Sequence, residues 1–270
     1  MSAGKKFQEF AEVVRISGKD SDKSPIHELV LRCPQIASLA LPGQFVTLGP
    51  ADDAGSVLRR PFSIYMADGR NIKVVFEARG PNTDRYARLS RGERISVLGP
   101  IGRPAAFDQA IELLLLVSGG CGLASLHYYT TWWIEQNPRV KAVLSAGFRS
   151  PEYCFGLPDF ADLGVETECI FDAEGTAVDL FQDMLSRESN LPDSGKIRVI
   201  TCGPEKMMRS VAGLCQQNDI PCQVFLERMI ACGTGDCKGC AVKTTDPKNP
   251  VKHLCEDGPM FDAMEVRWNG

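Results

Sequence analysis

Apolar and polar residues alternate along several short stretches of the chain before residue 102. This alternation predicts β-strands over residues 7–16, 27–31, 44–48, 72–77 and 95–98, with one helix over 84–90. Residue pairs that favour turns, such as Pro42-Gly43 and Asp68-Gly69, lie between the strands. Short strands at this spacing are typical of a small antiparallel barrel or sandwich, and we expect a β-barrel.

After residue 102 the pattern changes to continuous apolar runs and helical stretches. Residues 113–117 read Leu-Leu-Leu-Leu-Val, which is typical of a parallel strand covered on both faces. Further strands are predicted over 140–146, 166–170 and 197–201, and helices over 123–135, 176–187 and 204–217. Alternating strands and helices predict a doubly wound α/β domain built on a parallel sheet.

The chain therefore divides into three parts by pattern. We expect a β-barrel domain at residues 1–102, an α/β domain at 103–225 and a small C-terminal segment at 226–270, where regular periodicity fades. So short a segment cannot bury a large core, and we expect a bound metal to hold it together.

Composition and charge exclude several classes of protein. The 270 residues are 44% hydrophobic and 24% charged, as in an ordinary globular protein. A net charge of −4 without a basic tract argues against binding to nucleic acid or to a membrane surface. No apolar run is long enough to span a bilayer, and the N-terminal residues show no signal peptide. We therefore expect a cytoplasmic protein, whose eleven cysteines are kept reduced.

Four cysteines near the C-terminus form the most specific motif of the sequence. Cys232, Cys237 and Cys240 are separated by four and two residues, and Cys255 follows after fourteen more. This is the plant-type ligand spacing of a [2Fe–2S] cluster. Glycines between the cysteines allow the loop to curl and bring backbone N–H groups close to the sulfurs: Gly233, Gly235 and Gly239. A structural zinc site is the alternative, but zinc more often uses two separate Cys-x2–4-Cys pairs or a mixture of Cys and His.

The other cysteines and the histidines form no comparable set. Most of the remaining seven cysteines are expected to be small buried hydrophobic residues: Cys33, Cys121, Cys154, Cys169, Cys202, Cys215 and Cys222. The three histidines are too scattered to form a metal site or a catalytic triad: His27, His127 and His253.

Two segments of the predicted barrel have residues suited to a flavin nucleotide. Arg60 can bind a phosphate and Ser63 can offer a hydroxyl to a flavin ring, although the same segment also fits an ordinary edge strand. Asn82 and Thr83 open the predicted helix, where N–H groups and a hydroxyl can bind an anion. The alternative for both residues is plain helix capping.

Two segments of the α/β domain lie where such sheets bind ligands, at the carboxyl ends of strands. The first contains three glycines after the apolar run: Gly119, Gly120 and Gly122. The second is Cys202-Gly203-Pro204, in which Pro204 can open a helix and Cys202 can lie beside the carbon that exchanges hydride. The alternatives are a tight turn for the glycines and a buried thiol for Cys202.

These motifs, taken in order, resemble the ferredoxin–NAD(P) reductase superfamily, in which an FAD-binding barrel precedes a nicotinamide-binding α/β domain. The C-terminal stretches 227–240 and 254–261 closely resemble the electron-transfer subunit of NAD-dependent dihydroorotate dehydrogenase, the PyrK family. The resemblance covers nearly the whole chain.

The resemblance implies three cofactors and their binding residues. FAD would be bound by Arg60, Pro61, Phe62, Ser63, Glu77, Ala78, Arg79, Asn82 and Thr83. NAD(H) would be bound by Gly119, Gly120, Gly122, Cys202, Gly203 and Pro204. The cluster would be held by Cys232, Cys237, Cys240 and Cys255.

The family also implies a partner and an order of electron transfer. Electrons would pass from the FMN of a catalytic dihydroorotate dehydrogenase subunit through the cluster and FAD to NAD⁺, in a heterotetramer with two copies of each chain. A flavin is needed between the cluster and NAD⁺ because the cluster transfers single electrons and hydride carries two.

The chain departs from the family pattern in two places. Gly80-Pro81-Asn82-Thr83 stands where the family often has Gly-x-Gly-Thr, and Cys121 and Ser125 replace a Thr and a Pro. A related reductase subunit that serves ferredoxin, hydrogenase or sulfite reductase is therefore an alternative, as is a redox-sensing module without enzymatic activity. Arg149-Ser150 can equally receive the 2′-phosphate of NADP, so the choice between NAD and NADP stays open.

Overall fold

The computed structural model describes residues 5–18, 24–49, 58–106, 111–187 and 191–268. The chain forms two compact units. Unit 1 consists of Met1–Ala105, Glu227–Val242 and Val251–Pro259, and unit 2 of Ala106–Leu226, Lys243–Pro250 and Met260–Gly270. The C-terminal segment is thus shared between the two units, and an independent third domain at 226–270 stays a prediction.

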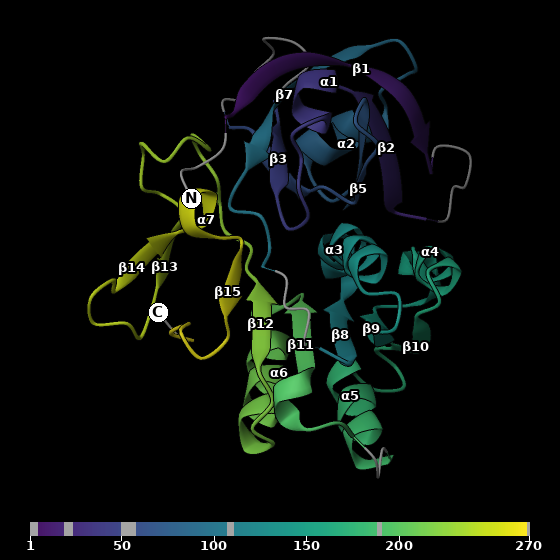
Figure 1. The fold of residues 1–270 in the computed structure, drawn as a ribbon. Helices are drawn as coiled ribbons and strands as arrows, with labels where there is room; N and C mark the ends of the chain where they lie inside the picture. Colours follow the sequence, from purple (N-terminus) through teal and green to yellow (C-terminus); the bar gives the residue numbers. More distant parts are fainter. Residues whose placement is uncertain (1–4, 19–23, 50–57, 107–110, 188–190, 269–270) are drawn as a thin grey trace. The chain divides into compact units, whose positions relative to one another are not determined.

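Unit 1 is built on a seven-stranded antiparallel sheet that curls into a half-barrel, as the predicted barrel domain requires (Figure 1). The strand order is β4-β3-β7-β1-β2-β6-β5. The strands are β1 (Phe7–Ser17), β2 (Ile26–Arg32), β3 (Phe45–Leu48), β4 (Arg60–Ser63), β5 (Met66–Ala67), β6 (Asn71–Glu77) and β7 (Arg94–Ile101). Side chains from alternate positions, such as Val13, Leu31, Val74 and Val97, are fully buried and form the core.

Two short helices accompany this sheet, α1 (Pro34–Ala37) and α2 (Pro81–Ala87). The sequence predicts α2 three residues too late, because Pro81 already opens it. The sequence does not predict α1. Its first N–H groups, those of Gln35 and Ile36, donate to the carboxylate of Glu9 on β1, at 3.3 and 2.8 Å. This cap comes from a distant part of the chain.

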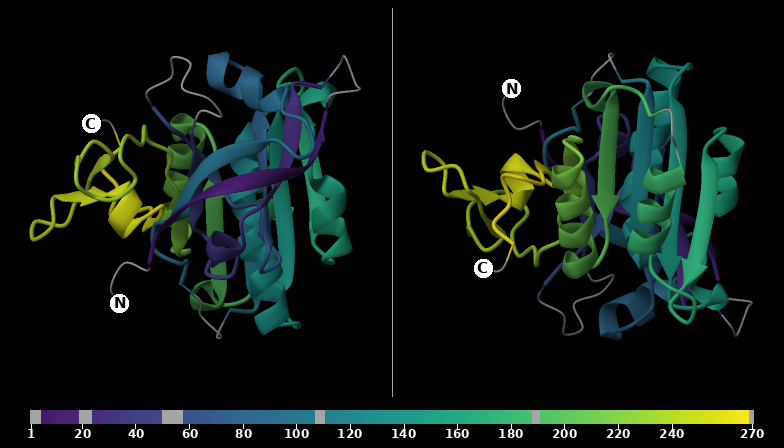
Figure 2. Two further views of the ribbon diagram at one scale, coloured as in Figure 1. Left: turned by 90° about the horizontal axis from the view of Figure 1, so that it is seen from above. Right: turned by 90° about the horizontal axis from the view of Figure 1, so that it is seen from below.

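Unit 2 contains a six-stranded sheet in the order β10-β9-β8-β11-β12-β15. Its strands are β8 (Leu113–Gly119), β9 (Lys141–Phe148), β10 (Glu166–Phe171), β11 (Ile197–Cys202), β12 (Cys222–Phe225) and β15 (Met260–Asp262). Helices pack on both faces (Figure 2): α3 (Leu123–Gln136), α4 (Leu157–Asp162), α5 (Ala177–Arg187) and α6 (Glu205–Gln217). The first five strands are parallel, which confirms the doubly wound α/β prediction.

The last strand departs from the predicted all-parallel sheet. β15 pairs antiparallel with β12, with Val224 opposite Phe261. Both strands are short and lie outside the strands predicted from sequence. A strand from the C-terminal segment thus pairs with the edge of the parallel sheet, which would otherwise expose unpaired N–H and C=O groups.

The rest of the C-terminal segment forms a two-stranded sheet of β13 (Ala241–Lys243) and β14 (Val251–His253), followed by helix α7 (Leu254–Asp257). In the part of the chain that the structure describes, no helix has the length and apolar character needed to cross a membrane.

Candidate cofactor sites

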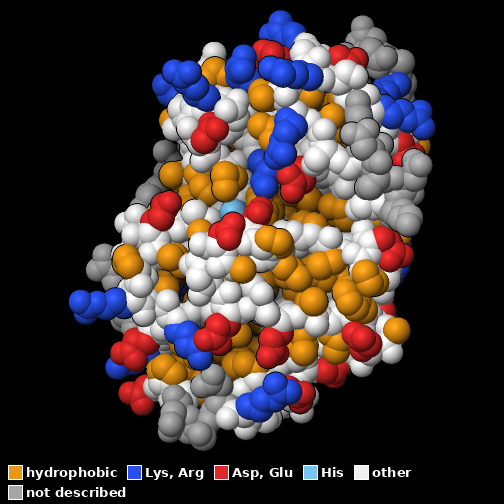
Figure 3. Space-filling view, turned by 90° about the vertical axis from the view of Figure 1, so that its right-hand side faces the viewer, with side chains coloured by type: hydrophobic (Ala, Val, Ile, Leu, Met, Phe, Trp, Pro, Cys, Tyr) orange, Lys and Arg blue, Asp and Glu red, His pale blue; other side chains and the backbone are white. Residues whose placement is uncertain are grey.

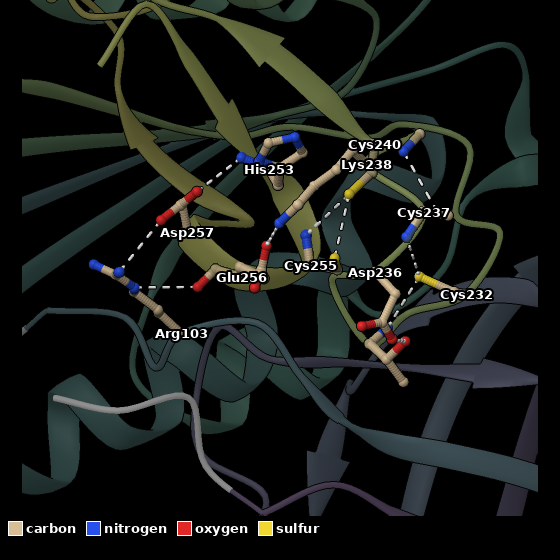
Figure 4. Close-up of polar contacts among 12 residues, drawn as sticks. Arg103, Cys232, Asp236, Cys237, Lys238, Cys240, His253, Cys255, Glu256 and Asp257 are labelled. Atoms are coloured by element: carbon tan, nitrogen blue, oxygen red, sulfur yellow. Dashed lines mark hydrogen bonds and ion pairs between the residues drawn. The ribbon is translucent and has the colours of Figure 1, made fainter. Parts of the chain in front are cut away.

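The four motif cysteines gather in unit 1, on the loop before β13 and on α7 (Figure 4). The sulfurs of Cys240 and Cys255 are 3.3 Å apart, and Leu254 N–H donates to the carbonyl of Cys240 at 3.0 Å. Two thiolates on a tetrahedral metal ion, each bonded at about 2.3 Å, lie about 3.8 Å apart. The two thiols are therefore adjacent, and a small increase in their separation would let them share one metal ion.

The cysteines are arranged as two pairs. The thiols of Cys232 and Cys237 interact with each other, as do those of Cys240 and Cys255. The charge interaction between Cys255 and Cys232 links the two pairs, so the four thiols belong to one site. Four cysteines at this spacing are the ligand set of a [2Fe–2S] cluster.

Backbone N–H groups point at the sulfurs. The sulfur of Cys232 accepts N–H groups of Thr234 and Cys237, both at 3.4 Å, and that of Cys237 accepts Gly239 N–H at 3.4 Å. Burial raises the pKa of the Cys232 thiol, but the hydrogen bonds from Thr234 and Cys237 outweigh it and lower that pKa to about 6. Donors in these positions stabilise thiolates and an anionic cluster.

The backbone conformation at Gly235 favours glycine. Its φ of +98° lies in the left-handed region, which strains any residue with a Cβ. A Cβ here would also be 2.5 Å from Cδ of Glu256, so that side chain would have to move aside.

The predicted FAD segment Arg60, Pro61, Phe62 and Ser63 forms β4, an edge strand of the half-barrel whose side chains are half-buried. Phe62 lies against two other aromatic rings, 5.5 Å from Phe76 and 5.9 Å from Tyr86 between centroids. Tyr86 also donates its hydroxyl to the carbonyl of Leu48 at 3.0 Å. The sequence gave no signal for this aromatic cluster, because its members come from three separate elements.

The residue before this segment, Arg59, has a structural role. Its guanidinium donates to Thr47 Oγ1 at 3.1 Å and to the carbonyl and hydroxyl of Ser96 at 2.9 and 3.0 Å. Burial lowers its pKa below the ordinary value. Arg59 thus ties the start of β4 to β3 and β7, and the phosphate contact of Arg60 stays a prediction.

The second predicted FAD segment lies at the end of β6 and the start of α2. Arg79 forms an ion pair with Glu77 at 3.5 Å. The hydroxyl of Thr83 accepts the N–H groups of Arg79 and Gly80, at 3.0 and 3.1 Å, and donates to the carbonyl of Gly80. Thr83 therefore acts as a helix cap. Ala78 connects the strand to this turn, and Asn82 is buried at the beginning of the helix.

The two predicted NAD(H) segments, distant in sequence, lie side by side in unit 2. β8 and β11 are parallel neighbours with Ser118 opposite Cys202, and the strand order reverses between them. Open α/β sheets bind ligands at this kind of switch point. The segments that follow the two strands are therefore neighbours: Gly119, Gly120 and Gly122 after β8, and Gly203 and Pro204 after β11.

Glycine permits the close approach of these segments. A Cβ on Gly119 would lie 2.7 Å from Pro204 Cδ, and one on Gly203 would lie 2.9 Å from the Gly119 nitrogen. A Cβ on Gly122 would collide with the carbonyl of Cys202. The glycines therefore serve the packing of two loops as well as the approach of a ligand.

Buried polar side chains surround the switch point. Cys202 is fully buried, and its sulfur donates to Ser125 Oγ at 3.4 Å. Ser118 and Thr201 are fully buried too, yet within the described residues their hydroxyls have no hydrogen-bond partner. Their successive register positions put the two hydroxyls on opposite faces of the sheet. The role of Cys202 in hydride transfer stays a prediction, since its thiol is directed at Ser125.

The end of β9 has a basic and aromatic surface. Nη1 of Arg149 donates to the hydroxyl of Tyr153 at 2.8 Å, and its guanidinium lies 4.5 Å from the centre of that ring. The following residues Cys154, Phe155 and Leu157 are half-buried. Figure 3 shows many hydrophobic side chains on the side where α4 and β10 lie in Figure 1. Doubly wound sheets receive the adenosine ribose at this strand end.

Comparison with solved structures identifies the class of protein. An NADH-dependent reduced ferredoxin-NADP oxidoreductase has a TM-score of 0.83 at 24% identity, covering 97% of this chain and 91% of that chain. Ferredoxin-NADP⁺ reductase from Plasmodium falciparum has a TM-score of 0.64 at 14% identity, covering 82% and 96%. The fold is that of the ferredoxin-NADP reductases.

Sequence relatives identify the family. The family model for the iron-sulfur cluster binding domain of dihydroorotate dehydrogenase B matches residues 227–267. The electron transfer subunit of dihydroorotate dehydrogenase B (NAD(+)) from Lysinibacillus sphaericus is 31% identical over 94% of this chain and 98% of its own. The subunit of that name from Listeria monocytogenes is 29% identical over 90% and 93%. The chain belongs to the family of dihydroorotate dehydrogenase B electron transfer subunits.

Proposed function

We propose that this protein transfers electrons between a catalytic dihydroorotate dehydrogenase subunit and NAD⁺ in pyrimidine biosynthesis. The cysteine loop is the observation that carries the proposal. It combines the [2Fe–2S] ligand spacing, two thiol pairs and N–H groups directed at sulfur with a match to the family's cluster-binding domain. When bound, the cluster transfers single electrons and FAD converts between single electrons and the hydride of NAD(H).

The chain's own residues hold and orient these groups. Cys232, Cys237, Cys240 and Cys255 bind the cluster, and the loop N–H groups stabilise its negative charge. In the half-barrel, Arg60 neutralises the FAD pyrophosphate and the segment around Ser63 contacts the flavin ring. The half-buried position of β4 at a sheet edge supports this role.

In unit 2 the glycine loop after β8 and the Cys202–Pro204 segment bind the nicotinamide nucleotide. Their adjacency at the switch point supports the assignment. Cys202 is buried and donates a hydrogen bond to Ser125. It thereby fixes the shape of the loop that faces the nicotinamide ring.

The partner is a catalytic subunit with FMN, which contains the dihydroorotate site, and the complex is a heterotetramer with two copies of each chain. The names of the relatives, which describe an electron transfer subunit, support a separate catalytic chain. We place the complex in the cytoplasm, where free thiols such as those of Cys33 and Cys215 stay reduced.

Co-expression with the FMN-containing catalytic subunit tests the proposal. The purified complex should oxidise dihydroorotate with NAD⁺ as acceptor. The Cys237→Ser variant should lose iron and this activity while FAD remains bound, because the ligand is separate from the flavin segments. Wild-type iron in Cys237→Ser, or co-purification with a hydrogenase, ferredoxin or sulfite reductase instead, would contradict the proposal.

A further inference from the structure

An ion pair joins the two segments that carry the cluster cysteines. Nζ of Lys238 is 2.7 Å from Oε2 of Glu256 (Figure 4). Lys238 follows Cys237 directly in the loop, and Glu256 follows Cys255 directly on α7. One positive and one negative charge therefore follow directly after two of the ligand cysteines and meet in an ion pair beside the cluster site.

The local backbone fixes both charges close to the site. Lys238 adopts a φ of +56°, a left-handed conformation that is uncommon for a residue with a side chain. The carboxylate of Glu256 lies over Gly235, where a Cβ would be 2.5 Å from Oε1. The glutamate side chain is thus laid across the loop instead of extending into solvent.

Arg103, which follows the end of β7, holds the backbone of α7. Its Nε donates to the carbonyl of Glu256 at 3.1 Å, and Nη2 pairs with Oδ1 of Asp257 at 3.2 Å. Asp257 in turn accepts the N–H of His253 at 2.8 Å. Another carboxylate in the loop, that of Asp236, accepts the hydroxyl of Thr234 at 2.6 Å. Asp236, Lys238 and Glu256 are each directly next to a ligand cysteine, and Lys238 and Glu256 are the two that form an ion pair with each other.

We propose that Lys238 and Glu256 tune the reduction potential of the cluster in opposite directions. The proposal rests on the proposed function, because it needs the four cysteines to hold a cluster. Reduction adds an electron and makes the cluster more negative. A nearby cation stabilises the reduced form and raises the potential, and a nearby anion lowers it. Together the two side chains of the pair carry no net charge.

Redox titration followed by electron paramagnetic resonance, on anaerobically purified protein, tests this. Lys238→Met should lower the midpoint potential of the cluster, and Glu256→Gln should raise it. The double variant should return close to the wild-type value. If one of these variants binds no iron, Lys238→Gln or Glu256→Ala removes the same charge with a different side chain.

A matched ion pair in unit 2 serves as the control. Lys196 Nζ and Glu112 Oε1 are also 2.7 Å apart and similarly exposed, and they lie at the amino ends of β11 and β8. Lys196→Met and Glu112→Gln should leave the potential unchanged.

The sign of the change in midpoint potential distinguishes an electrostatic effect of the two charges from a purely structural role of the ion pair. If the ion pair only held the loop closed, both single variants would loosen the cluster and shift its potential in the same direction. Shifts in the same direction, or no shift in either variant, would overturn the inference while leaving the proposed function intact. A wild-type protein without iron and sulfide would overturn both.

Discussion

Arg59 and Arg60 are neighbours in the chain but have different environments. The guanidinium of Arg59 makes hydrogen bonds to Thr47 and Ser96, on β3 and β7, whereas Arg60 begins the edge strand β4. The sequence names the segment as a flavin candidate, but it cannot tell which arginine is structural. That distinction depends on β3 and β7, which the chain brings to Arg59 from both sides of the segment.

We expect substitution of Arg59 to affect stability and substitution of Arg60 to affect FAD binding. Arg59→Ala should lower the free energy of unfolding by about 2 kcal/mol, because the buried hydrogen bonds of a charged group are lost. Arg60→Ala should change stability little but weaken FAD binding at least about tenfold, since it removes a phosphate contact. Denaturant unfolding of the apoprotein and FAD titration would measure both. Equal effects of the two variants on both quantities would contradict the assignment.

Arg149 bears on the choice of nucleotide. Its guanidinium is held against Tyr153 at the end of β9, where doubly wound sheets receive the adenosine ribose. Arg149→Ala should therefore reduce kcat/KM for NADPH more than for NADH, because a cation at this place interacts with a 2′-phosphate. Steady-state reduction of an artificial acceptor with each nucleotide measures the ratio. An unchanged ratio would place the ribose elsewhere.

At the scale of elements, the loop between β8 and α3 packs against the end of β11 through its glycines. Gly122→Ala should destabilise unit 2 by about 2 kcal/mol or more, because the added Cβ would collide with the backbone of Cys202. Gly213→Ala on α6 is the control, since a Cβ there meets no atom within 4 Å. In that helix interior alanine should be neutral or stabilising by up to about 1 kcal/mol. Thermal unfolding of both variants measures the difference, and equal stability would contradict the close approach.

The elements that the sequence predicts are those with a strong pattern of their own. β2, β6 and β8 were predicted to within about two residues at each end, because burial imposes alternation or a continuous apolar run. The sequence missed α1, α4, β5, β12 and β15, which have between two and six residues. Contacts from elsewhere in the chain stabilise such short elements, as the carboxylate of Glu9 does for α1.

The candidate sites show the same contrast: features local in sequence were predicted, and features that join distant segments were not. The cysteine spacing indicated the cluster because its ligands are close in sequence. The sequence also named both nicotinamide segments, but their adjacency became visible only through the parallel pairing of β8 and β11. The ion pair between Lys238 and Glu256 and the aromatic cluster around Phe62 had no sequence signal, because the partners come from separate segments.

At the scale of the whole molecule, each unit supplies a different part of an electron-transfer protein. Unit 1 contains the predicted flavin segments and the four motif cysteines, and unit 2 contains the predicted nucleotide segments. The C-terminal segment contributes α7 to the first and β15 to the second. The sequence pattern of this segment predicted a separate domain. It gave no sign that β15 pairs with β12, because neither short strand can be recognised from its own sequence.

The most direct test of this account is an anaerobic titration of the isolated protein with NADH, followed by visible absorption. Iron, sulfide and FAD are assayed on the same sample. We expect FAD and a [2Fe–2S] cluster in equal amounts, and bleaching of both by NADH without the catalytic subunit, since the chain holds every site between the nucleotide and the cluster. Zinc in place of iron, absence of flavin, or a cluster that stays oxidised after the flavin is reduced would contradict the account.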